Sequence, residues 1–217
     1  HLLMASKTDY HKTYIKICGL FRPEDIFYVN EARPDYAGFI INFEKSHRNV
    51  SSDTVVSLKK LLLPDIKSVG VFVDEDISSI CSLYNMGVLD VIQLHGHESN
   101  IYINELRKQI PKAIIWKAFK IRQKSDIIQC MASDADMVLL DNGYGTGDTF
   151  NWELTRDISR PYILAGGLTP ESIPDAIKKL KPWGIDISSG VETNKLKDKK
   201  KIISAVAAAR SDMKGVI

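Results

Sequence analysis

The chain has 217 residues, 44% of them hydrophobic and 26% charged, which suits a compact globular protein and excludes a disordered or fibrous one. Its 29 Lys and Arg residues nearly balance 27 Asp and Glu residues, so a net charge of +2 argues against binding to nucleic acid or to an anionic membrane. The length favours one large α/β domain over two small ones.

The three cysteines, Cys18, Cys81 and Cys130, are far apart, and none belongs to a CxxC pair. This pattern predicts neither a disulfide framework nor a zinc site, and it is typical of the reducing cytoplasm. No apolar run reaches the roughly 18 to 20 residues that a membrane span needs, and no signal peptide is visible. We interpret residues 1–13 as an N-terminal extension or expression remnant, with Met4 as the candidate start, and residues 14–217 as one folded domain.

Short runs of β-forming residues recur along the chain, and segments with helical spacing lie between them. The apolar residues Ile101, Leu106 and Ile110 indicate one such helix, and a further helix is expected after the last strand. We predict eight strands, at residues 14–18, 36–41, 68–73, 88–94, 113–119, 137–140, 162–165 and 184–187.

Eight strands that alternate with helices, without a Pro-, Gly- or Ser-rich linker, predict a single (β/α)8 TIM barrel. An open doubly wound sheet is the alternative, but it seldom holds eight strands in so short a chain. No GxGxxG motif follows the first strand, which also argues against that fold's dinucleotide-binding form. In a barrel the working residues lie where strands end and loops begin, so each strand end holds candidates.

Two glycine-containing pairs follow the last two predicted strands, Gly166-Gly167 and Ser189-Gly190. Backbone N–H groups with no side chain in the way can bind a phosphate dianion. The loops after strands 7 and 8 commonly form a phosphate site in such barrels. We therefore predict a phosphate-binding site at these two pairs.

Two helix starts are also predicted in this region. The sequence Thr169-Pro170-Glu171 combines an N-cap, a Pro at the first helical position and an acidic first turn. The basic run from Lys195 to Lys201 is interpreted as the solvated start of the final helix, with a patch for polyanions as the alternative.

Two strand ends carry residues suited to acid–base chemistry. If the face with Lys16 and Cys18 points into the barrel, an ammonium lies beside a thiol at its mouth and favours the thiolate, a base or nucleophile. Asp141 follows an apolar run, and partial desolvation there would raise its pKa toward the range of a general acid. The alternatives are a buried structural cysteine and an aspartate that caps its own loop.

His95 and Arg48 lie near two further strand ends. His95 is a candidate ligand, acid or donor to a substrate carboxylate, and a satisfied core histidine is the alternative. Arg48 offers a planar cation that can bind a carboxylate through two hydrogen bonds, unless it is an ordinary solvated loop arginine. The strand ends provide no set of His and carboxylate ligands, so we predict no metal site.

Together these residues fall in motifs that resemble phosphoribosylanthranilate isomerase, a (β/α)8 family of tryptophan biosynthesis. The resemblance runs from about Lys16 to the last helix, and the motifs occur in the family's order. They are KICGL at 16–20, QLHG at 93–96, LLD at 139–141, GTG at 145–147, LAGGLTP at 164–170 and DISSGVE at 186–192.

The resemblance implies an Amadori rearrangement that converts N-(5'-phosphoribosyl)anthranilate, an aminoaldose, to 1-(o-carboxyphenylamino)-1-deoxyribulose 5-phosphate, an aminoketose. It implies no cofactor and no partner besides this small phosphorylated substrate, and we expect a monomer, with a dimer as the alternative. Cys18 would be the general base at C2', and Asp141 the general acid that protonates the ring oxygen. Arg48 and His95 would lie near the anthranilate, and Asp186 near the sugar hydroxyls. The phosphate would be held by Gly166, Gly167, Ser189 and Gly190.

Two loops depart from the family's usual pattern. SHRN at 46–49 replaces the commoner SPRY, and GYG at 143–145 is less rich in glycine than is typical. Both departures concern loop rigidity and substrate affinity rather than the type of reaction.

Three rival functions are weighed on the same residues. A metal-dependent pentose-phosphate epimerase needs paired histidine ligands, which are absent. An indole-forming synthase needs Lys and Glu as acid–base groups, and Lys117 is the candidate that points that way. A barrel that only binds a phosphorylated ligand would leave Cys18 and Asp141 without a role.

Overall fold

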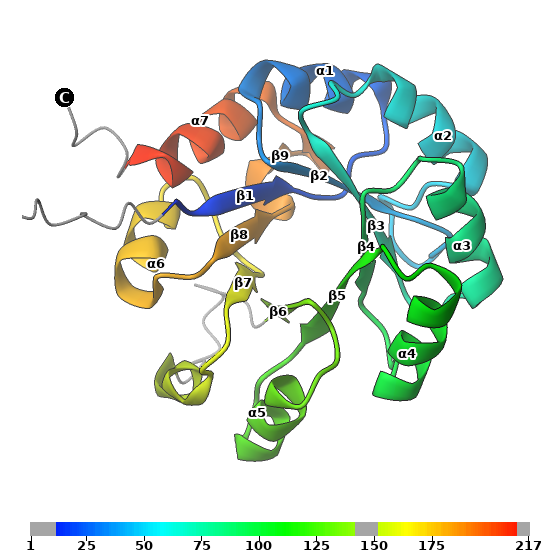
Figure 1. Cartoon of the computed structure of the whole chain (residues 1–217). Coiled ribbons are helices and arrows are strands. Elements are labelled where there is room, and N and C mark those ends of the chain that lie inside the picture. The colour runs from blue at the N-terminus through cyan, green and yellow to red at the C-terminus, as the bar shows by residue number, and fades with distance from the viewer. Residues whose placement is uncertain (1–11, 142–151, 212–217) are drawn as a thin grey trace, which may run out of the picture.

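The computed structural model describes residues 12–141 and 152–211, and eight parallel strands in it close into a barrel in chain order (Figure 1). The barrel closes where β1 pairs with β8, with Lys16 opposite Asp186. This confirms the predicted (β/α)8 barrel. The strands are β1 (Tyr14–Ile17), β2 (Tyr36–Ile40), β3 (Lys67–Phe72), β4 (Val91–Leu94), β5 (Ile114–Phe119), β6 (Met137–Asp141), β7 (Tyr162–Ala165) and β8 (Gly184–Ile187).

Seven α-helices surround the barrel in the part of the chain that the structure describes (Figure 1). After β6, the described part of the connection forms a 3-10 helix, η1 (Trp152–Asp157), where strict alternation predicts an α-helix. The GTG motif at 145–147, the GYG loop at 143–145 and most of the predicted N-terminal extension lie outside the described residues. The helices are α1 (Pro23–Ala32), α2 (Ser52–Leu61), α3 (Ile77–Asn85), α4 (Asn100–Gln109), α5 (Lys124–Met131), α6 (Ile173–Leu180) and α7 (Lys199–Ala209).

Polar side chains fix where several of these helices begin. Ser51, Ser99 and Asp198 precede α2, α4 and α7, and each accepts a hydrogen bond from a backbone N–H of the first turn. Such a cap satisfies a donor that has no partner within the helix and contributes about 1 kcal/mol. The strand-to-helix loops therefore end at defined residues, which holds the barrel mouth in place.

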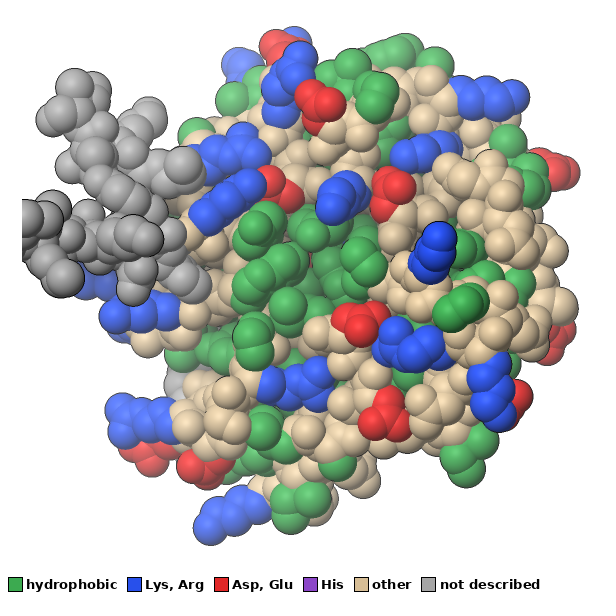
Figure 2. Space-filling view, in the orientation of Figure 1, with side chains coloured by type: hydrophobic (Ala, Val, Ile, Leu, Met, Phe, Trp, Pro, Cys, Tyr) green, Lys and Arg blue, Asp and Glu red, His purple; other side chains and the backbone are tan. Residues whose placement is uncertain are grey.

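The sheet has an apolar core on each side. The outer core lies between the strands and the helices and contains Ile15 and Ile17 of β1. The inner core includes Tyr36 and Trp116, whose rings meet edge-on with centroids 4.9 Å apart. In the space-filling view, hydrophobic side chains gather at the centre of one face, and charged side chains surround them (Figure 2).

Aromatic rings fill the barrel at the end where its strands begin. Tyr14 is the first residue of β1, and its ring stacks on that of Trp183, just before β8, with centroids 4.2 Å apart. Trp183 also meets the edge of Trp116 at 6.2 Å. Since this end is packed, the opposite end of the barrel is the one that can hold a site.

The chain after β8 differs from the prediction. It forms a 3-10 helix, η2 (Ser189–Val191), and a hairpin of β9 (Glu192–Thr193) and β10 (Leu196–Lys197) before α7 begins. Lys197 is only 3% exposed, so the interpretation of 195–201 as a solvated run is wrong at this residue. Lys197 points inward because the hairpin folds it under the end of β8.

The start of α6 is also later than predicted. Regular helix begins at Ile173 instead of Pro170, because residues 170–172 form a turn. Thr169 nevertheless caps that turn. Its hydroxyl accepts from the Ser172 N–H at 3.2 Å, and the Ser172 hydroxyl accepts from the Thr169 N–H at 2.9 Å.

Candidate active site

A cavity of about 270 Å³ opens where the barrel strands end. A larger hollow of about 750 Å³ beside η1 and α6 holds none of the predicted site residues. Of the nine site residues predicted from the sequence, eight line the smaller cavity, and Gly190 does not. The eight are Cys18, Arg48, His95, Asp141, Gly166, Gly167, Asp186 and Ser189.

Cys18 stands at the end of β1 with Lys16 beside it. Alternation along the strand sends Ile15 and Ile17 to the outer core and these two side chains inward, as predicted. Lys16 Nζ lies 3.2 Å from Cys18 Sγ. Burial raises the pKa of the Cys18 thiol, and the Lys16 ammonium opposes this without reversing it. The cation therefore acts in the direction expected from the sequence, toward the thiolate, but burial outweighs it.

Lys16 itself is protonated and fully partnered. Burial alone would lower its pKa, but the Asp186 carboxylate and Cys18 outweigh burial and raise it. The ammonium donates to Gln93 Oε1 at 2.8 Å, to Asp186 Oδ2 at 3.0 Å and to Cys18 Sγ at 3.2 Å. Since an ammonium has three protons, each has one acceptor.

Gly38 on β2 makes room for this pair. A Cβ at residue 38 would lie 2.7 Å from both Cys18 Sγ and Lys16 Cε, closer than side-chain atoms can approach. A larger residue would therefore displace the thiol or the ammonium. Gly38 sets the position of Cys18 without touching the cavity.

Asp141, at the end of β6, is joined to His95, at the end of β4. His95 Nε2 lies 3.1 Å from Asp141 Oδ2, and His95 Nδ1 lies 3.1 Å from Gln93 Nε2. The hydrogen bond from His95 lowers the pKa of Asp141 more than burial raises it. The predicted rise in the pKa of Asp141 is therefore wrong, and the physical reason is the imidazole of His95, which the fold places beside it.

Asp186 on β8 offers one free carboxylate oxygen. Its Oδ2 accepts from Lys16, while Oδ1 is buried and has no hydrogen-bond partner among the described residues. An unsatisfied buried acceptor costs about 1 to 3 kcal/mol. Because the residue also lines the cavity, Oδ1 is available to a donor on a ligand.

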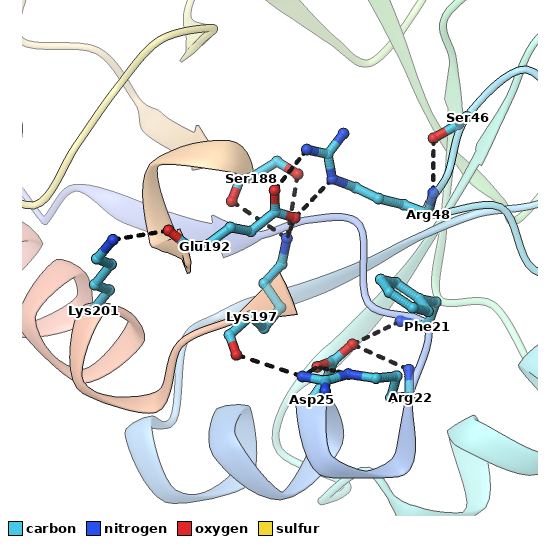
Figure 3. Close-up of polar contacts among 9 residues, drawn as sticks. All are labelled: Phe21, Arg22, Asp25, Ser46, Arg48, Ser188, Glu192, Lys197 and Lys201. Atoms are coloured by element: carbon cyan, nitrogen blue, oxygen red, sulfur yellow. Dashed lines mark hydrogen bonds and ion pairs between the residues drawn. The ribbon is translucent and has the colours of Figure 1, made fainter. Parts of the chain in front are cut away.

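Arg48 is not a solvated loop arginine. Its Nε and Nη2 donate to the two carboxylate oxygens of Glu192 at 2.8 and 2.7 Å, and Figure 3 shows Glu192 between Arg48 and Lys197. Lys197 donates to Glu192 Oε2 at 2.7 Å and to the carbonyl oxygen of Ser188 at 3.3 Å. The lateral edge of the guanidinium is thus occupied, and Nη1 remains for a second acceptor.

The two glycine-containing pairs differ in what the structure does with them. Gly166 and Gly167 have φ of 88° and 64°, a left-handed conformation that favours glycine, and both line the cavity. Gly190 does not line it. A Cβ at residue 190 would collide with the carbonyl oxygen of Leu168, so glycine is needed there for the loops after β7 and β8 to meet.

The sequence reasoning missed four residues that shape this site: Gly38, Gln93, Glu192 and Lys197. Two of them were open to inference, because Gln93 shares the inward face of β4 with His95, and Glu192 closes a motif that was already singled out. Gly38 acts through the close approach of β1 and β2, and Lys197 acts through the hairpin that turns it back toward Ser188 and Glu192. A single sequence reveals neither of these contacts.

Lys117, the residue that suggested an indole-forming synthase, faces away from the cavity. Its neighbour Trp116 belongs to the inner core, while Lys117 pairs with the buried Glu98 at 2.9 Å. Among residues 12–141 and 152–211, no group of three or more His, Cys, Asp or Glu side chains could hold a metal ion. No helix within those ranges is both long and apolar enough to cross a membrane.

Comparison with known proteins gives one family. The family model described as N-(5'phosphoribosyl)anthranilate (PRA) isomerase matches residues 15–208. An N-(5'-phosphoribosyl)anthranilate isomerase of Endomicrobium trichonymphae is 43% identical over 91% of this chain and 98% of its own length. The corresponding protein of Acetivibrio thermocellus is 41% identical over 94% and 99%.

Solved structures agree with the sequence relatives. A crystal structure of phosphoribosyl anthranilate isomerase from Thermotoga maritima matches with a TM-score of 0.80 at 32% identity, over 92% of this chain and 99% of that one. A phosphoribosyl anthranilate isomerase in complex with reduced 1-(o-carboxyphenylamino)-1-deoxyribulose 5-phosphate matches with a TM-score of 0.79 at 31% identity and the same coverage. The chain therefore belongs to the N-(5'-phosphoribosyl)anthranilate isomerase family and is an aldose–ketose isomerase of tryptophan biosynthesis.

Proposed function

We propose that this chain rearranges N-(5'-phosphoribosyl)anthranilate to 1-(o-carboxyphenylamino)-1-deoxyribulose 5-phosphate with Cys18 as general base and Asp141 as general acid. The observation that carries the assignment is that both residues line the same cavity, at the ends of β1 and β6. A base and an acid on separate strands can reach different atoms of one small sugar.

The acid acts first. The proton of Asp141 goes to the furanose ring oxygen, the bond between C1' and that oxygen breaks, and the nitrogen lone pair forms a protonated Schiff base. The hydrogen bond from His95 lowers the pKa of Asp141. The anionic phosphate and carboxylate of a bound substrate would raise it again, because nearby negative charge disfavours a second carboxylate.

The base acts second. Cys18 removes the proton from C2', the electron pair of that C–H bond forms a C1'–C2' double bond, and the nitrogen becomes an amine. The resulting enolamine takes a proton at C1' as the hydroxyl at C2' loses its proton to solvent, which yields the ketone at C2'. The cationic Schiff base favours the thiolate, which offsets the burial that raises the pKa of Cys18. The reaction moves protons within one substrate and needs no cofactor.

The remaining residues hold the substrate. Nη1 of Arg48 would bind the anthranilate carboxylate near His95, and Oδ1 of Asp186 would accept from a sugar hydroxyl. The backbone N–H groups of Gly166, Gly167 and Ser189, which line the cavity, would bind the phosphate. Gly190, predicted from the sequence as a fourth binding residue, would instead let the loops after β7 and β8 meet.

The test is turnover by purified protein in a chelator, followed as the loss of the substrate's fluorescence. We expect activity without added metal and its loss in the Cys18→Ala, Asp141→Ala double variant. Full activity in that variant would refute the assigned roles, and phosphate density away from residues 166–167 and 189–190 would refute the binding site. A barrel that only binds the substrate would show no turnover at all.

We also propose that the protein works as a monomer in the reducing cytoplasm. Three free, buried cysteines, Cys18, Cys81 and Cys130, suit a reducing compartment. A dimer is the alternative, because the Thermotoga maritima relative is described as dimeric. Sedimentation equilibrium of the full chain distinguishes the two states.

A further inference from the structure

Gln93 lies between the two halves of the site and contacts both. Its side chain projects from β4, and the residue is 1% exposed. Its Oε1 is 2.8 Å from Lys16 Nζ, and its Nε2 is 3.1 Å from His95 Nδ1. One amide thus connects Lys16, beside the proposed base, with His95, beside the proposed acid, and Gln93 takes no part in the proposed acid–base steps.

The direction of these hydrogen bonds follows from Lys16. An ammonium only donates, so it must face the amide oxygen, and the amide NH2 must face His95. The NH2 group donates, so Nδ1 of the imidazole must accept. The single proton of the neutral ring then lies on Nε2 and points at Asp141 Oδ2, 3.1 Å away.

We propose that Gln93 is a positioning residue that holds His95 as the neutral Nε2–H tautomer. The inference rests on the proposed role of Asp141 as the acid. In this tautomer Nε2 already carries a proton, and Nδ1 is blocked by the amide. His95 therefore cannot take the proton that Asp141 holds for the substrate, and it can only donate to the carboxylate.

The Gln93 amide also prevents proton transfer through itself between the Cys18 side and the Asp141 side of the site. Moving a net proton through an amide requires its unstable imidic acid form, so Gln93 transmits orientation and no proton. The amide contacts the Lys16 ammonium, which also pairs with Asp186 on β8. On its other side His95 contacts Asp141 on β6, whose carboxylate is also influenced by the charge of Lys120, just after β5. The contacts through Gln93 therefore carry no proton between Cys18 and Asp141.

The first test measures the tautomer directly in the full chain. With ¹⁵N-labelled histidine, His95 should show a protonated Nε2 and an unprotonated Nδ1 at neutral pH, and a His95→Asn variant assigns its signals. A protonated Nδ1 in the unsubstituted protein, whether in the other tautomer or in the imidazolium, would overturn the proposal. This measurement does not depend on turnover, so it is independent of whether the proposed reaction occurs.

The second test uses two substitutions at Gln93. Gln93→Met keeps the length but removes both hydrogen bonds, so we expect mixed tautomers and a kcat about 100-fold lower, with KM within about threefold. Gln93→Glu places an acceptor against Nδ1 and should make His95 doubly protonated. Gln129→Glu makes the same change on the exposed face of α5 and should alter neither readout.

These outcomes separate the two proposals. Absence of turnover in the unsubstituted protein contradicts the proposed function, whereas the wrong tautomer contradicts the role of Gln93. An unchanged kcat in folded Gln93→Met, or an unchanged His95 spectrum in either variant, would also overturn that role. If a variant fails to fold, the spectrum of the unsubstituted protein decides.

Discussion

Lys16 Nζ donates to Cys18 Sγ at 3.2 Å inside the barrel, from two positions earlier on the same strand. Burial favours the neutral thiol, and the ammonium is the main group that counteracts it. The pKa of Cys18, and with it the ability of Cys18 to act as a base, therefore depends on the buried Lys16, which is 1% exposed. Removing the charge of Lys16 is therefore the most direct way to change how Cys18 takes the proton from C2' of the substrate.

We expect Lys16→Met to raise the pKa of Cys18 further, because the charge that favours the thiolate is lost. Alkylation of Cys18, followed by mass spectrometry of its peptide, should shift to higher pH. The value of kcat/KM should fall about 100-fold or more. Because Asp186 loses its buried partner, unfolding should also become easier by about 3 to 5 kcal/mol.

The matched control is Lys12→Met, which breaks an ion pair to Asp35 at the surface. An exposed pair contributes about 0.2 to 1 kcal/mol, and this variant should leave the alkylation profile unchanged. If Lys12→Met and Lys16→Met shift the profile equally, the ammonium beside the thiol does not control its ionisation.

Gly38→Ala should reduce activity from outside the cavity. The new Cβ would lie 2.7 Å from Cys18 Sγ and from Lys16 Cε, so one of them must move. Overpacking of this kind costs about 1 to 3 kcal/mol, and a displaced base costs kcat about 100-fold.

Gly87→Ala is the comparison for this variant. It strains a backbone with φ of 75°, but no atom lies within 4 Å of the new Cβ. It should lower stability by about 1 kcal/mol and leave kcat unchanged. A normal kcat in Gly38→Ala would show that the added methyl group does not displace the Cys18 thiol from its working position.

Local pattern was enough to predict the barrel and the shared face of Lys16 and Cys18 on β1. Strand alternation depends only on neighbours along the chain, so Lys16 and Cys18 could be placed on one face without knowing the rest. The strand-end rule likewise gathered Cys18, His95 and Asp141 at one mouth. These inferences hold because each depends on a geometric period that the fold preserves.

The pKa directions could not be predicted in the same way. The pKa of Cys18 depends on how deeply β1 is buried, and that of Asp141 on the exact contact with His95, 46 residues away. Lys197 looks solvated in a run of lysines, and only the hairpin of β9 and β10 shows that it is buried. Charge balance between distant segments is the part that the sequence leaves open.

Glu192→Gln should weaken substrate binding through Arg48. The amide keeps the shape of Glu192 but loses the charge that orients the guanidinium, so KM should rise about tenfold with a smaller change in kcat. The effect should disappear with an aniline analogue of the substrate that lacks the carboxylate. Equal KM changes for both substrates would contradict the role of Arg48, and Glu105→Gln on α4, at an exposed pair with Lys108, serves as the control.

Glu192 should also leave a signature in acid. Burial alone would raise the pKa of Glu192, but its hydrogen bonds to Arg48 and Lys197 outweigh burial and lower the pKa to about 2. A carboxylate with a lowered folded-state pKa stabilises the fold at pH values above its unfolded pKa, and this contribution is lost as the pH falls toward 2.

With solvent screening discounted, we expect Glu192 to contribute on the order of 1 to 3 kcal/mol at neutral pH, and more than half of this contribution should be lost by about pH 3. Urea unfolding of the unsubstituted protein and of Glu192→Gln, from pH 7 to pH 2.5, measures this directly. Other carboxylates titrate in both proteins, so the difference between their unfolding free energies isolates Glu192. That difference should shrink steadily below pH 4.5, the ordinary value for this group. A constant difference across the whole range would mean that the Glu192 carboxylate does not hold Arg48 and Lys197 through its charge.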